Sequence, residues 1–432
     1  MEHKTSKTIQ IESRHGFHIL ADQFQSDPSF VENFIPFAQA TACSHILVEV
    51  LDLQALPVSA IRALVENGIA VDVFLKTNLQ DDFDLLAYQD FISNLAGLQV
   101  SRLILFDRPN QQPFWKPDIW VKPNLVDFFL EKFILLAEQC LEKNIQPSFP
   151  PLQPGGDYWD TAFLRLALQT LLDKGKQALL AGLTLSAYTW SYGHPLDWGA
   201  GGPERWPATI PYFTPADSQD QLGFRIFDWY ETNSKAVLDH TLPIILLQTG
   251  RDGEYGKSGA DASSNHQVMV LQDILEMLYP EIYGSSLEEQ KVLEALPAEI
   301  VQCNFLLDLD RETITGLFKP TGTAKFTQRN ASAAPEEKSI PPSSNQHYLL
   351  LPDESWLSDP FKESALEPFV HQFHPRMGTS LDEALDAREV TLVITAAGEA
   401  AEQFDILQQQ EHIFLRKMRV EVPAVAEENH DH

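Results

Sequence analysis

The chain alternates between short, uninterrupted apolar runs and longer segments whose apolar residues recur with helical spacing. The apolar runs lie at residues 16–20, 45–51, 69–75, 102–106, 145–150, 178–188, 242–247 and 299–307. Such runs are typical of strands buried on both faces of a parallel sheet. Helices are predicted at residues 58–67, 125–144, 160–172, 222–238 and 265–279. Eight strand–helix units over about 300 residues predict an α/β fold, a (β/α)8 TIM-type barrel. An open doubly wound sheet has a similar rhythm and is the alternative.

The composition changes after the eighth run. Residues 320–346 are rich in Thr, Ser, Ala, Pro and Gly, which predicts a linker or mobile loop. Beyond it, strand-like runs at 347–351, 390–394 and 413–420 alternate with helix-like segments at 381–388 and 399–410. The predicted organisation is an N-terminal tail (1–13), the barrel (14–319), the linker (320–346), a small C-terminal α/β unit (347–422) and an acidic tail (423–432).

The charge balance limits the classes of partner. With 31 Lys and Arg against 61 Asp and Glu, the formal net charge is -30. A nucleic acid or an anionic membrane surface would need a basic face, so neither is expected. The three cysteines, Cys43, Cys140 and Cys303, match no metal-ligand spacing, and we expect neither a metal nor another cofactor. The N-terminus lacks the apolar segment of a signal peptide, and no stretch is long enough to span a bilayer, which predicts a cytoplasmic protein.

A loop rich in Trp, Tyr, Gly and Pro follows the sixth run. Barrel enzymes keep their ligand sites in the loops at the C-terminal ends of the strands. Sugar rings stack on aromatic side chains, so this loop predicts a carbohydrate site. The candidate ligand-binding residues here are Tyr188, Trp190, Tyr192, Trp198 and Trp206. The alternative is that the rings pack on one another and stiffen the loop. Three residues near other strand ends are weaker candidates for the same pocket: Glu49, Lys76 and Asn304.

Three strand endings carry a family resemblance. The fourth run ends in Asp107-Arg108-Pro109-Asn110, the sixth in Ala187-Tyr188, and the seventh in an apolar run followed by Gln248-Thr249-Gly250. Over about residues 14–315 this plan resembles the large clan of retaining glycoside hydrolases with (β/α)8 barrels. Their fourth strand ends in Asn-Glu-Pro, often with a further Asn, and their seventh in Glu-x-Gly. The resemblance implies that Arg108 stands in the place of the acid/base glutamate, Gln248 in the place of the nucleophile, and Asn110 beside a bound ligand.

Both replacements matter for the chemistry. The retaining mechanism needs two carboxyl groups about 5–5.5 Å apart. Arginine has no usable acid/base equilibrium near neutral pH, and the glutamine amide cannot form a glycosyl ester. The resemblance therefore implies a pseudoenzyme, unless nearby acids serve instead. The candidates for such displaced catalytic acids are Asp107, Asp252 and Glu254.

Three functions remain open from the sequence. The first is a catalytically degenerate, glycosidase-like barrel that binds a saccharide or related polar ligand at its C-terminal mouth. The second is an active glycoside hydrolase with displaced carboxylates. The third is a non-enzymatic scaffold whose C-terminal unit binds a protein partner. Two further motifs are weaker: Gly250 to Ser258 resembles a phosphate-binding loop with one residue too many, and His371 and His374 lack a third metal ligand.

Overall fold

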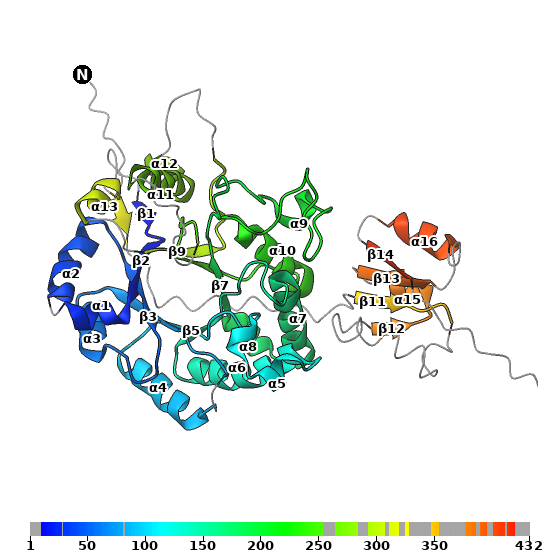
Figure 1. Ribbon diagram of the computed structural model, residues 1–432, viewed down its shortest axis with the longest axis horizontal. Coiled ribbons are helices and arrows are strands. Elements are labelled where there is room, and N and C mark those ends of the chain that lie inside the picture. The colour runs from blue at the N-terminus through cyan, green and yellow to red at the C-terminus, as the bar shows by residue number, and fades with distance from the viewer. Residues whose placement is uncertain are drawn as a thin grey trace, which may run out of the picture.

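The computed structural model describes residues 10–27, 29–80, 83–253, 264–283, 293–306, 311–318, 325–327, 347–353, 366, 376–385, 389–394, 401–410 and 413–419. Its largest feature is a closed barrel of eight parallel strands, enclosed by helices (Figure 1). The strands are β2 (His15–Leu20), β3 (His45–Val50), β4 (Ala70–Leu75), β5 (Arg102–Leu105), β6 (Gln146–Phe149), β7 (Thr184–Tyr188), β8 (Ile244–Leu247) and β9 (Ile300–Leu306). The last strand pairs with the first, Gly16 opposite Asn304, which confirms the predicted barrel and rules out the open sheet.

Helices and short helical turns connect the strands and cover the outside of the barrel. They are α1 (Ala21–Ser26), α2 (Phe30–Ala40), α3 (Val58–Glu66), α4 (Leu85–Gly97), η1 (Gln112–Phe114), α5 (Pro117–Trp120), α6 (Leu125–Glu142), α7 (Asp160–Asp173), α8 (Gln177–Gly182), α9 (Gly202–Arg205), α10 (Ile226–Leu238), α11 (Ser264–Leu278), α12 (Pro280–Tyr283) and α13 (Arg311–Leu317). None of the helices within the described residues combines the length and hydropathy that a bilayer crossing requires.

One predicted strand was partly wrong. The apolar run at 178–188 was read as a single strand, but its first part belongs to α8, and β7 begins only at Thr184. A short apolar run does not distinguish a buried helix from a buried strand by periodicity alone. Gly182, at the end of α8, lies against Leu141 of α6, so the helix packs on its neighbour before the chain turns into the barrel.

The barrel has two apolar cores because successive strand residues face opposite sides. The outer core lies between strands and helices, where Phe17 and Ile19 of β2 and Cys303 and Phe305 of β9 are buried. The inner core fills the barrel with the following side chains: Leu47, Phe74, Ile104, Tyr188, Trp190, Ile245, Leu247 and Val301. The inward-facing residues nearest the C-terminal ends of the strands are therefore placed together at the mouth.

A long segment between β7 and α10 is tied down by buried polar contacts. Asp160, at the start of α7, accepts hydrogen bonds from the Gly155 amide (3.1 Å), the Gln221 side chain (2.8 Å) and the Tyr230 hydroxyl (3.3 Å). Burial raises the pKa of Asp160 to about 6, although these hydrogen bonds lower it. One carboxylate thus joins the loop after β6, the loop after β7 and helix α10.

Part of the predicted linker is ordered against the predicted N-terminal tail. The strand β1 (Gln10–Glu12) pairs in parallel with β10 (Lys325–Thr327). In the C-terminal region, a four-stranded parallel sheet has the order β12-β11-β13-β14. Its strands are β11 (His347–Leu350), β12 (Arg376–Gly378), β13 (Glu389–Ile394) and β14 (Phe414–Arg419), with helices α15 (Leu381–Leu385) and α16 (Ala401–Gln408). Alternate residues of β11 face two separate apolar clusters, with Tyr348 and Leu350 in one and Leu349 in the other.

Candidate functional site

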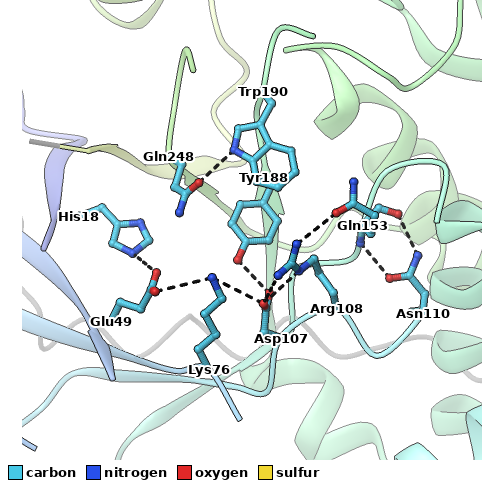
Figure 2. Close-up of polar contacts among 10 residues, drawn as sticks. All are labelled: His18, Glu49, Lys76, Asp107, Arg108, Asn110, Gln153, Tyr188, Trp190 and Gln248. Carbon is cyan, nitrogen blue, oxygen red and sulfur yellow. Dashed lines mark hydrogen bonds and ion pairs between the residues drawn. The ribbon is translucent and has the colours of Figure 1, made fainter. Parts of the chain in front are cut away.

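Polar side chains from several barrel strands converge at the C-terminal mouth (Figure 2). They come from positions at or just after the strand ends. These residues are His18 and Glu49 on β2 and β3, Lys76 after β4, Asp107 and Arg108 after β5, Gln153 after β6, Tyr188 on β7 and Gln248 after β8. The structure therefore brings together five residues singled out from the sequence for their charge or amide: Glu49, Lys76, Asp107, Arg108 and Gln248.

Four charged groups of the mouth form a continuous network. The ammonium of Lys76 lies between two carboxylates, 3.6 Å from Oε1 of Glu49 and 3.8 Å from Oδ2 of Asp107. Arg108 pairs with the same Asp107 oxygen through Nε (3.0 Å) and Nη2 (2.9 Å). Two cations thus face two carboxylates, and the network is close to electrically neutral.

Burial and charge shift the two carboxyl groups of the network in opposite directions. Burial raises the pKa of Glu49, but the hydrogen bond from His18 and the charge of Lys76 help to outweigh it, so the pKa ends below its ordinary value. Burial also raises the pKa of Asp107, and here Arg108, Lys76 and Tyr188 reverse only part of the rise. The charged form of Glu49 is therefore favoured more strongly than that of Asp107.

Arg108 and Gln248 meet on the same pair of aromatic rings. Tyr188 and Trp190 stack with their centroids 4.4 Å apart and their planes at 19°. The guanidinium of Arg108 lies 5.9 Å from the centroid of the Tyr188 ring, while Trp190 donates a hydrogen bond from Nε1 to Oε1 of Gln248 (3.1 Å). Tyr188 also donates its hydroxyl proton to Oδ1 of Asp107 over 2.8 Å. Arg108 and Gln248, the two positions singled out by the sequence resemblance, thus share one centre.

The backbone at both positions is unusual. Arg108 has φ 51° and Gln248 has φ 47°, and Phe106, directly after β5, has φ 71°. The left-handed region is unfavourable for residues with a Cβ, by about 1 kcal/mol each, and such residues cluster at functional sites. The chain therefore turns sharply after β5 and β8, and this turn directs the side chains of Arg108 and Gln248 to the mouth.

Asn110 is a structural residue of the mouth. It is fully buried, and its amide donates to the carbonyl oxygens of Gln153 (2.8 Å) and Tyr158 (2.9 Å) and accepts from the Gln153 amide (2.8 Å). These bonds join the loop after β5 to the loop after β6. They also place Gln153, whose side chain accepts from Arg108 (3.4 Å) and donates to the Tyr192 hydroxyl (3.2 Å).

The aromatic residues of the loop after β7 have different surroundings. Tyr188 and Trp190 are 0% and 2% exposed and belong to the inner core, and Tyr192 packs edge-on against Trp190. Trp198 stacks on His194 and donates to Asp220 (3.0 Å), and Trp206 donates to the Ala200 carbonyl (2.9 Å). The contacts of Trp198 and Trp206 favour the alternative in which they stiffen the loop.

The remaining predicted residues lie at different depths. Asp252 accepts a hydrogen bond from the Ser191 hydroxyl (2.5 Å) in the loop above the barrel. Asn304 is fully buried on β9 and donates from Nδ2 to the Leu246 carbonyl (3.0 Å). Glu254 lies outside the described residues, as do His371, His374 and most of the stretch that resembles a phosphate-binding loop. The described part of the chain contains no group of three or more His, Cys, Asp or Glu side chains able to hold a metal ion.

Two residues of the mouth were missed from the sequence. His18 lies in the first apolar run, and its Nε2 is 2.9 Å from Oε2 of Glu49. Strand alternation could have indicated this position. Phe17 and Ile19 face the outer core, so His18 between them faces the inside of the barrel. Gln153 carries no such signal, because it lies in an irregular loop.

The chain was compared with protein-family models, curated proteins and solved structures. No protein-family model and no curated protein sequence matches the chain. Similar solved structures include the pneumococcal exo-β-D-N-acetylglucosaminidase StrH, with 10% identity over 72% of this chain and 84% of that chain and a TM-score of 0.36. A GH39 enzyme from Xanthomonas axonopodis pv. citri has 10% identity over 69% of this chain and 61% of its own, with a TM-score of 0.40. D-allulose 3-epimerase from Methylomonas sp. has 14% identity over 62% of this chain and 82% of its own, with a TM-score of 0.33. Glycoside hydrolases are thus among the structural neighbours, and at TM-scores of 0.40 and below the likeness decides nothing about this chain.

Proposed function

We propose that the mouth of this barrel binds a neutral saccharide or a related polar ligand without the two-carboxylate hydrolytic mechanism. The observation that carries this proposal is the meeting of Arg108 and Gln248 on the Tyr188–Trp190 pair. A guanidinium and an amide hold the two places where the resembling hydrolases have a proton donor and a nucleophile. Neither group can do that work.

The charge of the mouth supports a neutral ligand. Glu49 and Asp107 are matched by Lys76 and Arg108, so a ligand need bring no charge of its own. The partly exposed side chains at this level, among them Gln153 and Tyr192, supply amide and hydroxyl groups. Such groups bind sugar hydroxyls by hydrogen bonds. In this proposal, Tyr188 and Trp190 form the wall behind the polar groups.

Calorimetric titration and tryptophan fluorescence with a panel of neutral oligosaccharides test the proposal, together with a turnover assay on aryl glycosides. We expect binding without turnover. Arg108→Met should weaken the binding, whereas Lys122→Met, which removes a cation over Phe128 outside the mouth, should not. The proposal is rejected if no saccharide in the panel produces either a heat of binding or a change in fluorescence.

The second candidate function, an active hydrolase with displaced acids, is favoured by one observation. Glu49 and Asp107 flank the same ammonium, and their environments shift their pKa values in opposite directions. Pairs of carboxyl groups separated in this way serve as acid and base in known enzymes. Turnover of aryl glycosides that is lost in both Glu49→Gln and Asp107→Asn, but kept in Asp252→Asn, would establish this candidate. Absence of turnover in the unmodified protein would remove it.

A further inference from the structure

Buried polar side-chain atoms without a hydrogen-bond partner among the described residues include Nδ1 of His18 on β2 and Oδ1 of Asn304 on β9. Nε2 of Gln248, just after β8, also makes no hydrogen bond to a described residue, since the side chain bonds to Trp190 through Oε1. These strands are consecutive around the closed barrel. More than nine in ten buried polar groups in proteins are satisfied, so a cluster of unsatisfied atoms on neighbouring strands requires a reason.

The orientation of His18 follows from its partner. The Glu49 carboxylate accepts hydrogen bonds only, so Nε2 of His18, 2.9 Å away, carries the proton of that bond. In the neutral imidazole, Nδ1 is then an acceptor. This atom is buried, and no described residue bonds to it. A carboxylate that fixes the tautomer of a histidine leaves the second nitrogen ready to bind another group.

The orientations of the two amides are fixed in the same way. The Trp190 indole can only donate, so Gln248 faces it with Oε1 and directs Nε2 elsewhere. No hydrogen bond joins this Nε2 to any described residue. Asn304 donates from Nδ2 to the Leu246 carbonyl, which leaves its Oδ1 buried and unpaired. The three side chains thus present one donor group and two acceptors.

The three side chains face the inside of the barrel. Their neighbours Phe17, Ile19, Cys303 and Phe305 belong to the outer core, so alternation directs His18 and Asn304 inward. The edge-on contact of His18 with Phe74, a residue of the inner core, agrees with this. In Figure 2 the imidazole of His18 and the amide of Gln248 are directed at the same space beside Tyr188.

We propose that the inner wall formed by β8, β9 and β2 is a subsite for neighbouring hydroxyl groups of a neutral ligand. His18 Nδ1 and Asn304 Oδ1 accept hydroxyl protons, and Gln248 Nε2 donates to a hydroxyl oxygen. A hydroxyl group both donates and accepts, so it satisfies this set. Two acceptors disfavour an anion, and the ammonium of Lys76, held at Glu49, disfavours a cation. The subsite rests on the proposed function, because it assigns that function to particular atoms.

Two variants remove single acceptors. His18→Gln keeps a donor for Glu49, because the glutamine amide nitrogen replaces Nε2, but it lacks Nδ1. Asn304→Leu removes the unpaired oxygen at similar volume, together with the hydrogen bond from Nδ2 to the Leu246 carbonyl. The control is Thr184→Val, which deletes another buried, unpaired oxygen at the start of β7, far along the strand from the mouth. D-glucose, D-xylose and N-acetyl-D-glucosamine are the probes, titrated by calorimetry.

We expect both acceptor variants to bind these sugars at least about tenfold more weakly, and the control to bind them as the unmodified protein does. If the unmodified protein binds a sugar and both acceptor variants match it, the subsite is wrong and the proposed function stands. If the unmodified protein binds none of the three, the subsite is rejected, and the proposed function is decided separately by the oligosaccharide panel.

A spectroscopic measurement covers the case in which Asn304→Leu does not fold. In protein labelled with ¹⁵N-histidine, the signals missing from His18→Gln identify the His18 imidazole. We expect a protonated Nε2 and a bare Nδ1, whose resonance moves upfield when sugar is added. An Nδ1 resonance that already shows a hydrogen bond without sugar, and does not move with it, would assign the site to bound water and overturn the proposal.

Discussion

The indole of Trp190 donates a hydrogen bond to Gln248, and this bond decides which way the Gln248 amide faces. Because both side chains are almost fully buried, the bond has no ready replacement from solvent. It connects the loop after β7 to the turn after β8.

Gln248→Met is expected to lower the free energy of unfolding by about 1–3 kcal/mol, because the Trp190 N–H is left buried without an acceptor. In Trp190→Phe the donor is absent, so adding Gln248→Met to that background should cost less. Urea denaturation of the four proteins of this double-mutant cycle measures the coupling between the two side chains. If the loss of unfolding free energy in the double variant equals the sum of the losses in the two single variants, the bond contributes nothing to stability.

Asp107 holds the charge network together. Asp107→Asn leaves Lys76 and Arg108 with one carboxylate between them, and we expect a loss of about 3 kcal/mol in the free energy of unfolding, as for other broken buried ion pairs. Lys176→Met is the control, because its pair with Glu138 is well exposed and should contribute only about 0–1 kcal/mol. Similar costs for the two variants, measured by urea denaturation, would contradict the role given to Asp107.

Asp160 should make stability depend on pH. Burial raises its pKa to about 6 in the folded protein, above the ordinary value of 3.8, so the folded state binds this proton more tightly than the unfolded chain. The free energy of unfolding should therefore fall as pH rises between those two values, by up to about 3 kcal/mol from this group.

The measurement is urea denaturation from about pH 4 to about pH 7 for the unmodified protein and Asp160→Asn. The variant should lack this part of the slope. Asp173→Asn, at the exposed C-terminal end of the same helix, is the control and should keep it. Parallel pH profiles for Asp160→Asn and the unmodified protein would show that Asp160 does not bind its proton as described.

Gly199 is required by the loop after β7. It has φ 71°, and a Cβ there would overlap the carbonyl oxygen of Asp220. Gly199→Ala should therefore destabilise the protein by more than about 1 kcal/mol. In contrast, a Cβ at Gly97, the last residue of α4, meets nothing within 4 Å, and Gly97→Ala should stabilise by about 0.5 kcal/mol. Thermal unfolding distinguishes the two, and equal shifts would be inconsistent with the geometry at Gly199.

The fold was largely readable from the sequence because each barrel strand is an apolar run between turn signals. The exception, α8, shows the limit of that reading. Its apolar residues Leu179 and Leu180 are as buried as those of a strand, since the helix packs between α6 and the barrel. Burial makes such a segment apolar throughout, and a uniformly apolar segment shows neither the helical nor the strand periodicity that would distinguish the two.

Residues of the candidate site could be predicted from the sequence only where they lie at the end of a predicted strand. Glu49 and Lys76 were predicted in this way, and Arg108 and Gln248 by the resemblance to a family pattern. The hydrogen bonds that decide their roles depend on side chains far apart in the chain, such as Tyr188 with Asp107. Asn110 was expected beside a ligand, but its amide is engaged by Gln153 and Tyr158 in the next loop, a relation that no local pattern encodes.

The short pairing of Gln10–Glu12 with Lys325–Thr327 has a practical consequence. It places the segment that enters the barrel beside a segment that leaves it. A shortened chain that starts at Ser13 would lack the strand that pairs with residues 325–327. Removing N-terminal residues would therefore also destabilise a segment more than 300 residues further along the chain. In a chain shortened to residues 10–327, a bridge of a few residues from Thr327 to Gln10 would allow new termini to be opened in a surface loop elsewhere on the barrel.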